Sequence, residues 1–348
     1  MECTLMRYYT GLDVAMKDTF ICIVDEEGNK VYETKASSTP AAIFKSLEKS
    51  GFQSEKVGLE SGSLSRFLTK GLQNLGVPAV CIDSRKISAI LSVTINKTDK
   101  NDARGIADAI RCNHFKEIYV KSDEDASVEI LLKSRKTLVH LTGILKNTIR
   151  GFLKTYGVLL GDLQPKNFPK KVRETFQNIP QEAGDGIESL LKSFETNSLG
   201  VDIIDQKIKI LTAENNQVKL LMTIPGVGPI IASYFVFSLG EADRFKKSKS
   251  VGAYFGMTPR QYSSGETVSM GQISKFGDAD MRRLLTNAAM VLMTLTKNWS
   301  PLKAWGIKIA KKHGNKKAYM AVGRKLAVIM HRMLMTGEAF RYTAAVKA

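Results

Sequence analysis

The sequence predicts a mixed α/β domain at the N-terminus, followed by a largely helical chain. Short β-rich runs alternate with helical patterns up to about residue 120, and beyond Ser122 the apolar residues recur at the spacing of long helices. With 348 residues, the chain is long enough for two or three domains that each bury a core. We expect these domains to cover residues 1–120, 121–218 and 219–348.

Strand-forming segments fill the N-terminal third. Runs rich in β-branched and aromatic side chains predict strands at residues 9–14, 19–25, 30–34, 56–60 and 77–82. The pair Thr39-Pro40 predicts the start of a helix and Gly51 its end. A second helix is expected at residues 64–75. The resulting order is β-β-β-α-β-α-β, with the first three strands forming a meander.

A polar run at residues 97–103 opens a further helix and carries two acids. Asp99 and Asp102 are three residues apart, so they lie on one face of that helix. Two like charges at this spacing repel each other unless a cation lies between them, and clustered carboxylates suit Mg²⁺. Helix capping is the alternative, because Asp is favoured in the first turn of a helix.

Two other acids follow predicted strands. Asp13 ends the first strand and Glu60 ends the fourth. Alone, Asp13 fits a turn and Glu60 fits a solvent-facing loop. Together with Asp99 and Asp102 at the ends of elements, they favour one Mg²⁺ site built from four carboxylates.

The middle of the chain predicts two long amphipathic helices. Apolar residues recur every seven positions in two stretches: Leu131, Leu138, Leu145 and Phe152, then Ile204, Leu211 and Val218. A break containing Gly and Pro, at about residues 157–186, separates them. We expect a coiled-coil arm that folds back on itself or pairs with another subunit; two helices covering a core are the alternative. The basic run at 166–173 is expected to be a solvated loop, with contact to nucleic acid as the alternative.

The charge of the chain is concentrated at its C-terminal end. The whole chain has 51 Lys and Arg against 34 Asp and Glu, and from Ala242 onward there are 20 against 5. A basic domain joined to a nearly neutral one is typical of proteins that bind a polyanion, here nucleic acid. A membrane span at the uncharged residues 220–240 is excluded, because Pro225-Gly226-Val227-Gly228-Pro229 would break its helix in the middle.

The cysteines favour a reducing compartment. Cys22 and Cys81 lie in apolar strand-like runs, and the four cysteines show no paired metal-ligand spacing. The N-terminus lacks a long apolar stretch, so no secretory signal is expected. We expect a cytoplasmic protein.

Two segments of the basic region are candidates for contact with phosphates. The turn at residues 225–229, between two apolar helices, resembles a helix-hairpin-helix, in which Gly226 and Gly228 would expose backbone N–H groups. A plain tight turn between packed helices is the alternative. In the second segment, three hydroxyls compete as nucleophile: Tyr262, Ser263 and Ser264.

Cationic residues surround those hydroxyls. The four candidates for binding phosphate are Arg260, Lys275, Arg282 and Arg283. A loop that only contacts phosphate, without chemistry, would have the same composition. Four lysines further on are either nucleic-acid contacts or a solvated basic run: Lys311, Lys312, Lys316 and Lys317.

The combination of these features resembles one family. It consists of the four acids, the coiled-coil middle, Ile224-Pro225-Gly226-Val227-Gly228-Pro229, and the motif Thr-Pro-Arg-x-Tyr-x-Ser-Gly at residues 258–265. The chain resembles, over nearly its whole length, the transposases of bacterial insertion sequences that include pilin-gene DNA invertases and bridge-RNA-guided recombinases.

The resemblance implies a RuvC-type, ribonuclease-H-like N-terminal domain whose acids Asp13, Glu60, Asp99 and Asp102 hold Mg²⁺. It implies that Ser264 is the nucleophile of a DNA recombinase, with DNA as substrate, a guide RNA, and a homo-oligomer in which Ser264 of one subunit completes the site of another. Two other classes stay open: a metal-dependent junction nuclease, and a non-catalytic nucleic-acid-binding regulator.

Overall fold

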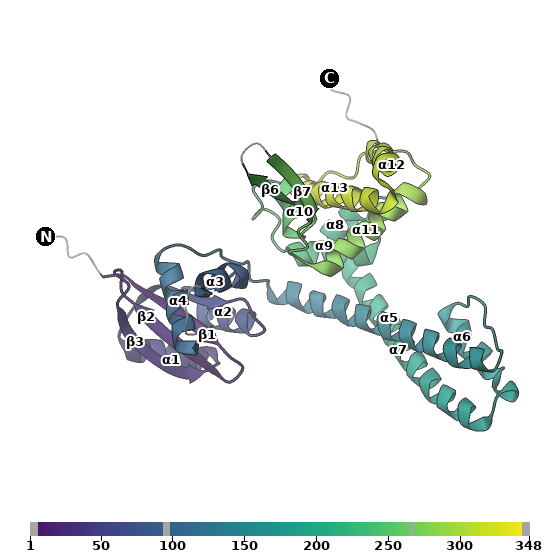
Figure 1. The fold of residues 1–348 in the computed structure, drawn as a ribbon, viewed down its shortest axis with the longest axis horizontal. Helices are drawn as coiled ribbons and strands as arrows, with labels where there is room; N and C mark the ends of the chain where they lie inside the picture. Colours follow the sequence, from purple (N-terminus) through teal and green to yellow (C-terminus); the bar gives the residue numbers. More distant parts are fainter. Residues whose placement is uncertain (1–5, 93–97, 265–266, 343–348) are drawn as a thin grey trace, which may run out of the picture. The chain divides into compact units, whose positions relative to one another are not determined.

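The chain forms two compact units, Met1–Lys121 and Ser122–Ala348. The structure is a computed structural model, and it describes residues 6–92, 98–264 and 267–342 (Figure 1). Within these ranges, no helix combines the length and the apolar character needed to cross a membrane. The further division of the second unit at residue 218 stays a prediction.

A mixed five-stranded sheet forms the first unit. Its strands are β1 (Tyr8–Val14), β2 (Asp18–Val24), β3 (Lys30–Ser37), β4 (Ser54–Glu60) and β5 (Ala79–Ile82). They lie in the order β3-β2-β1-β4-β5. The pairs β1–β2 and β2–β3 are antiparallel, whereas β1–β4 and β4–β5 are parallel. The predicted meander and the two later strands are confirmed.

Helices cover both faces of this sheet. Helices α1 (Pro40–Ser50) and α2 (Ser65–Asn74) cover one face, where Leu12 and Leu59 are buried with their apolar side chains. The start and end of α1 follow the prediction: the Thr39 side chain accepts a hydrogen bond from the Ala42 N–H, and Gly51 has a left-handed backbone with φ of 74°. Helix α3 (Ser84–Leu91) was not predicted, and α4 (Asp99–Arg111) covers the other face.

Two glycines allow α4 to lie directly on the sheet. Gly11 of β1 and Gly58 of β4 are direct neighbours in the parallel register. A Cβ atom on Gly11 would be 2.0 Å from the Ala103 carbonyl oxygen, and one on Gly58 would be 2.1 Å from Cδ1 of Ile110. The position of α4 therefore requires glycine at Gly11, where the overlap is with the helix backbone, whereas at Gly58 it is with the ends of the Ile110 and Ile82 side chains.

The second unit begins with a long helical arm. Helices α5 (Asp123–Thr155) and α7 (Gln181–Glu214) pack along each other. Arg135 forms an ion pair with Asp205, whereas the later part of α5 shares an apolar cluster with the earlier part of α7, so the two helices are antiparallel. Figure 1 shows this hairpin of helices in teal. At its end lie the two short 3₁₀ turns Pro165–Asn167 and Phe176–Asn178.

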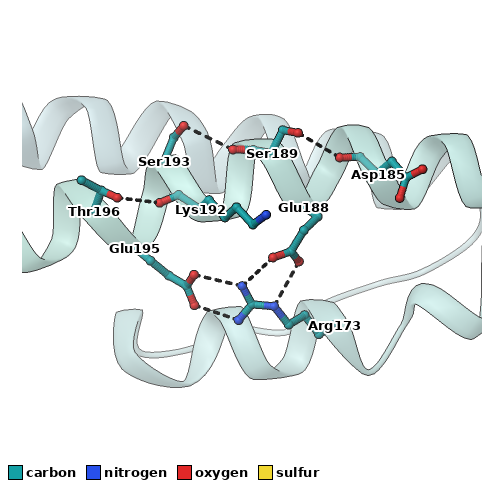
Figure 2. Close-up of polar contacts among 8 residues, drawn as sticks. All are labelled: Arg173, Asp185, Glu188, Ser189, Lys192, Ser193, Glu195 and Thr196. Carbon is teal, nitrogen blue, oxygen red and sulfur yellow. Dashed lines mark hydrogen bonds and ion pairs between the residues drawn. The ribbon is translucent and has the colours of Figure 1, made fainter.

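The predicted solvated loop at residues 166–173 is wrong. Residues Phe168–Arg173 form helix α6, and Phe168 and Val172 are completely buried between α5 and α7. Figure 2 shows the polar side of this contact, where the Arg173 guanidinium donates hydrogen bonds to the carboxylates of both Glu188 and Glu195. The arm end is thus a small packed cluster, and Arg173 is engaged within it. The break is also shorter than predicted, because α7 begins at Gln181.

The remaining helices build one large core. They are α8 (Asn216–Leu221), α9 (Pro229–Leu239), α10 (Lys249–Tyr254), α11 (Ala279–Thr294), α12 (Pro301–His313) and α13 (Asn315–Thr336). The first turns of α5 contribute Val128 and Leu132 to this core. Helix α5 therefore both covers a core and pairs with α7, which combines the two alternatives left open by the sequence.

The expectation of a helical C-terminal domain is wrong in one place. Strands β6 (Pro259–Ser264) and β7 (Thr267–Ile273) form an antiparallel hairpin where the sequence suggested a loop. Thr, Val, Tyr and Ile favour extended backbone, and the hydroxyl-rich composition concealed that preference. The buried positions expected for Cys22 and Cys81 are confirmed.

Replacing Gly11 with Ala should destabilise the first unit by at least about 2 kcal/mol, because the methyl group would overlap the backbone of α4. Urea unfolding of the whole chain, with hydrogen exchange at the β1 amides, measures the effect. Gly62→Ala is the matched control, since a Cβ at Gly62 has no neighbour within 4 Å. Equal stability of the two variants would contradict the close contact between α4 and the sheet.

Replacing Arg173 with Gln should loosen α6, by about 1 kcal/mol or less because the ion pairs are partly exposed. The hydrogen bond from Arg173 lowers the pKa of Glu195, so the contact contributes at pH values above the ordinary glutamate pKa of about 4.3 and is lost as the pH falls through the lower, folded-state pKa. Hydrogen exchange of the α6 amides against pH measures this. Lys171→Gln, which removes an exposed pair with Glu174 at the end of α6, is the comparison and should change that pH dependence less than Arg173→Gln does.

Candidate active site

The ends of two neighbouring strands bring Asp13 and Glu60 together. The last paired residues of β1 and β4 in the parallel register are Leu12 and Leu59, and the two acids follow them directly. Both line one pocket of about 450 Å³, together with the loop at residues 61–65. Side chains alternate along a strand, so Asp13 and Glu60 point to the same face of the sheet as Gly11 and Gly58, the face that α4 covers.

Helix α4 directs its acids toward this end of the sheet. Arg111 donates a hydrogen bond to the Glu26 carbonyl, just beyond β2, and forms an ion pair with Asp108 on the same side of the helix. Asp102 lies in the first turn of α4, at the other end of the helix from Arg111, and one turn before the buried Ile106, which packs with Ile82 of β5. Asp102 is therefore directed toward the carboxyl ends of β1 and β4, and it is half-buried, whereas Asp99 is exposed.

The N-terminal cap of α4 is Thr98, and neither Asp99 nor Asp102 has that role. The Thr98 hydroxyl accepts a hydrogen bond from the Asn101 N–H and so caps α4. Asp99 and Asp102 lie in the first turn, where the helix dipole favours a negative charge, but neither is the cap. Lys97, which precedes the cap, lies outside the described residues.

The four acids differ in how closely the structure brings them together. Asp13 and Glu60 share a pocket, and Asp102 faces the same end of the sheet. Within the described part of the chain, no three acidic, histidine or cysteine side chains are gathered closely enough to hold one metal ion. The donors are carboxylate oxygens, which are the ligands of hard divalent cations such as Mg²⁺. The chemistry of the donor set fits Mg²⁺, and its assembly around an ion stays a prediction.

The hairpin separates the three competing hydroxyls. Ser263 and Gln261 share one face of β6, and the Gln261 side-chain amide donates a hydrogen bond of 2.9 Å to the Ser263 hydroxyl. Tyr262 and Ser264 alternate with them and lie on the other face. Ser264 is exposed at the end of β6, and Gly265 after it lies outside the described residues.

The base of the hairpin is fixed to the helical core. The N–H groups of Ser274 and Lys275 donate to the carbonyls of Thr258 and Gly256, at 2.8 and 3.1 Å. The Arg282 guanidinium donates to the carbonyls of Phe255 (3.1 Å) and Gly277 (2.8 Å), and Phe255 is completely buried. Arg282 was expected to contact nucleic acid. Instead it joins the segment that enters the hairpin to the segment that leaves it, a role that the sequence did not indicate.

The other predicted cations are exposed. The Arg260 guanidinium lies 5.1 Å from the centre of the Phe276 ring. Lys275 has a left-handed backbone with φ of 58°, and Arg283 lies 4.0 Å from an Asp280 carboxylate oxygen. Arg260, Lys275 and Arg283 are accessible to a phosphate.

The two glycines of the turn before α9 have different roles. Gly226 has φ of 86°, and a Cβ there would be 2.7 Å from the Ala288 carbonyl oxygen of α11, so packing alone requires glycine. Gly228 has no such neighbour and precedes the first turn of α9. The turn lines a hollow of about 610 Å³ together with Lys297 and Asn298. The predicted contact of Gly226 and Gly228 with phosphate, through their backbone N–H groups, stays a prediction.

Comparison with known proteins accounts for both parts of the chain. The DEDD transposase model of the IS110 type matches residues 10–158, and the model described as "Transposase IS116/IS110/IS902 family" matches residues 218–303. The chain thus carries both of the domains found in transposases of the IS110/IS116/IS902 family. The first match contains all four predicted acids, and the second contains Ser264 and the turn at residues 225–229.

Two transposases of insertion sequences match most of the length of the chain. The transposase for insertion sequence element IS1111A of Coxiella burnetii is 28% identical over 340 residues, which is 95% of this chain and 90% of the relative. The transposase for insertion sequence element IS1328 of Yersinia enterocolitica is 26% identical, over 82% of this chain and 85% of the relative. A pilin gene-inverting protein of Moraxella bovis is 25% identical over 128 residues, or 36% of this chain and 39% of that protein. The protein is therefore a transposase that acts in DNA recombination.

Proposed function

We propose that this transposase excises and inserts DNA through a covalent serine–DNA intermediate. The observation that carries the proposal is the position of Ser264, exposed at the end of a hairpin whose base is fixed to a buried core. A nucleophile needs an open approach and a rigid support, and this strand end combines the two. Ser263 lies on the other face and is hydrogen-bonded to Gln261, which favours Ser264 over it.

In the proposed step, the Ser264 hydroxyl oxygen forms a bond to the phosphorus as the bond to a deoxyribose oxygen breaks. The serine proton passes to water and the released sugar oxygen gains one. One phosphodiester linkage replaces another, so its energy is kept for rejoining to a new DNA end. Arg260 and Lys275, both exposed, would neutralise charge on the phosphate oxygens.

The acids of the first unit would hold Mg²⁺ in this proposal. Asp13 and Glu60 on the shared pocket, with Asp102 and Asp99 on α4, are the residues that would bind it. When bound, Mg²⁺ would stabilise negative charge at a scissile phosphate. The sheet order β3-β2-β1-β4-β5, with its antiparallel meander, supports a ribonuclease-H-like domain of the RuvC type.

Nucleic acid and a second copy of the chain are the proposed partners. The excess of 20 Lys and Arg over 5 Asp and Glu from Ala242 onward supports binding to DNA and to a guide RNA. Helix α7 exposes an apolar stripe at helical spacing, Leu199, Ile203 and Ile210, with 60%, 51% and 59% of their surfaces accessible. This stripe supports a homo-oligomer, in which Ser264 of one copy would act with the acids of another.

Ser264→Ala should abolish both recombination and any covalent protein–DNA adduct, whereas Ser263→Ala and Tyr262→Phe should keep the adduct. Incubation with substrate DNA, followed by denaturing electrophoresis and mass spectrometry, should locate a phosphoserine in the peptide that contains Ser264. An adduct that persists in Ser264→Ala but is absent in Tyr262→Phe would identify a tyrosine enzyme. DNA cleavage with Mg²⁺ and no adduct in any variant would identify a junction nuclease instead.

Asp102→Asn should reduce recombination by at least about a hundredfold while leaving DNA affinity within about twofold, because the amide cannot supply a charged metal ligand. Asp108→Asn is the matched control, since Asp108 lies about 120° away around the same helix and forms an ion pair with Arg111. The two variants are compared by strand-exchange rate and by filter binding. Equal loss of activity in both variants would mean that α4 stability, and not the carboxylate, is responsible.

A further inference from the structure

The two faces of the β6–β7 hairpin differ in their chemistry. One face, which we call the serine face, carries Arg260, Tyr262 and Ser264; the other carries Gln261, Ser263 and Met270. A second observation, besides the alternation of side chains along a strand, places Arg260 on the serine face. A Cβ on Gly271 would be 3.7 Å from the Arg260 Cβ and 3.3 Å from Cε2 of Tyr262. Both side chains therefore lie on the same side of the hairpin as Gly271.

Tyr262 is an aromatic ring that the fold leaves uncovered. It is 60% exposed, and the residue beside its ring on β7 is Gly271, which has no side chain to cover it. Tyr262 is absent from all of the buried clusters of the described chain, and its ring contributes nothing to the core. An exposed aromatic ring of this kind is a platform on which a nucleic-acid base can stack.

The serine face continues this aromatic and cationic character toward the base of the hairpin. Arg260 lies 5.1 Å from the centre of the Phe276 ring, and Phe276 is itself 53% exposed. Two residues of a strand span about 6.8 Å, so Tyr262 and Arg260 follow Ser264 at steps comparable to successive nucleotides of an extended strand. Alternating rings and cations along one track are typical of single-strand binding surfaces.

We propose that the serine face binds an unpaired DNA strand and that Tyr262 stacks on the base next to the phosphate attacked by Ser264. The proposal rests on the proposed role of Ser264 as the nucleophile. A base inside a duplex is already stacked on its neighbours, so the strand must be unpaired where it meets Tyr262. Tyr262 is then a positioning residue: it holds the nucleotide while Ser264 reacts, and Arg260 contacts the next phosphate.

The test uses the full chain carrying Ser264→Ala, so that binding is measured without chemistry. A short single-stranded DNA with one 2-aminopurine reports stacking by the quenching of its fluorescence. Adding Tyr262→Ala should remove the quenching and weaken binding roughly 5- to 150-fold, which corresponds to a loss of about 1–3 kcal/mol of stacking. Tyr262→Phe should retain both, because stacking needs the ring and not the hydroxyl.

Met270→Ala is the matched control, since Met270 is equally exposed, at 61%, on the other face of the same hairpin. It should leave quenching and affinity unchanged. The inference is overturned if Tyr262→Ala alters neither quantity, if Met270→Ala has the same effect, or if Tyr262→Ala weakens binding to a fully paired duplex just as much.

The same series separates this inference from the proposed function. With Ser264 present, quenching that depends on Tyr262 without any adduct would leave the strand-binding face in place and reject the serine mechanism. An adduct that forms with no contribution from Tyr262 to binding or quenching would keep the mechanism and reject the stacking role.

Discussion

The first unit depends on the close contact between α4 and the sheet. Gly11 and Gly58 form a flat site on two neighbouring strands, and the backbone of α4 at Ala103 lies directly against it. This contact fixes the distance of α4 from the sheet and the rotation of α4 about its own axis. With Arg111 held at one end of the sheet by the Glu26 carbonyl, Asp102 is directed to the other end, where Asp13 and Glu60 share a pocket. The orientation of Asp102 thus follows from the packing of α4 on the sheet.

The direction of the β6–β7 hairpin depends on how its base is attached to the helical core. A two-stranded ribbon is marginally stable alone, so its direction has to come from its attachment. Phe255 is buried in the core, and Arg282 of α11 holds the carbonyls of Phe255 and Gly277 together from one side. Asp278 accepts hydrogen bonds from the N–H groups of Asp280 and Met281, and so caps the helix that carries Arg282. Ser264 thereby acquires a defined position although its own strand is exposed.

The sequence predicts the elements whose boundaries are set by neighbouring residues. Helix α1 lies between the Thr39 cap and Gly51 as expected, because both signals are local. Helix α6 was missed because Phe168 and Val172 are buried against residues of α5 and α7 that are distant in sequence. Asp13 and Glu60 were recognisable as strand-end acids, and the parallel register explains why they share a pocket. The role of Arg282 was not predictable, since its acceptors are backbone carbonyls, which every residue has.

The proposed metal ligands and the proposed nucleophile differ in their exposure to water. Asp13 and Glu60 are half-buried at the edge of a rigid sheet, where desolvation strengthens their interaction with a cation. Ser264 stands at an exposed strand end, where water surrounds the hydroxyl and lowers its reactivity. In the proposed mechanism, Ser264 would become reactive only when a DNA phosphate and its neighbouring groups cover the hairpin and exclude that water. The proposed nucleophile would then depend on its own substrate for a catalytic environment.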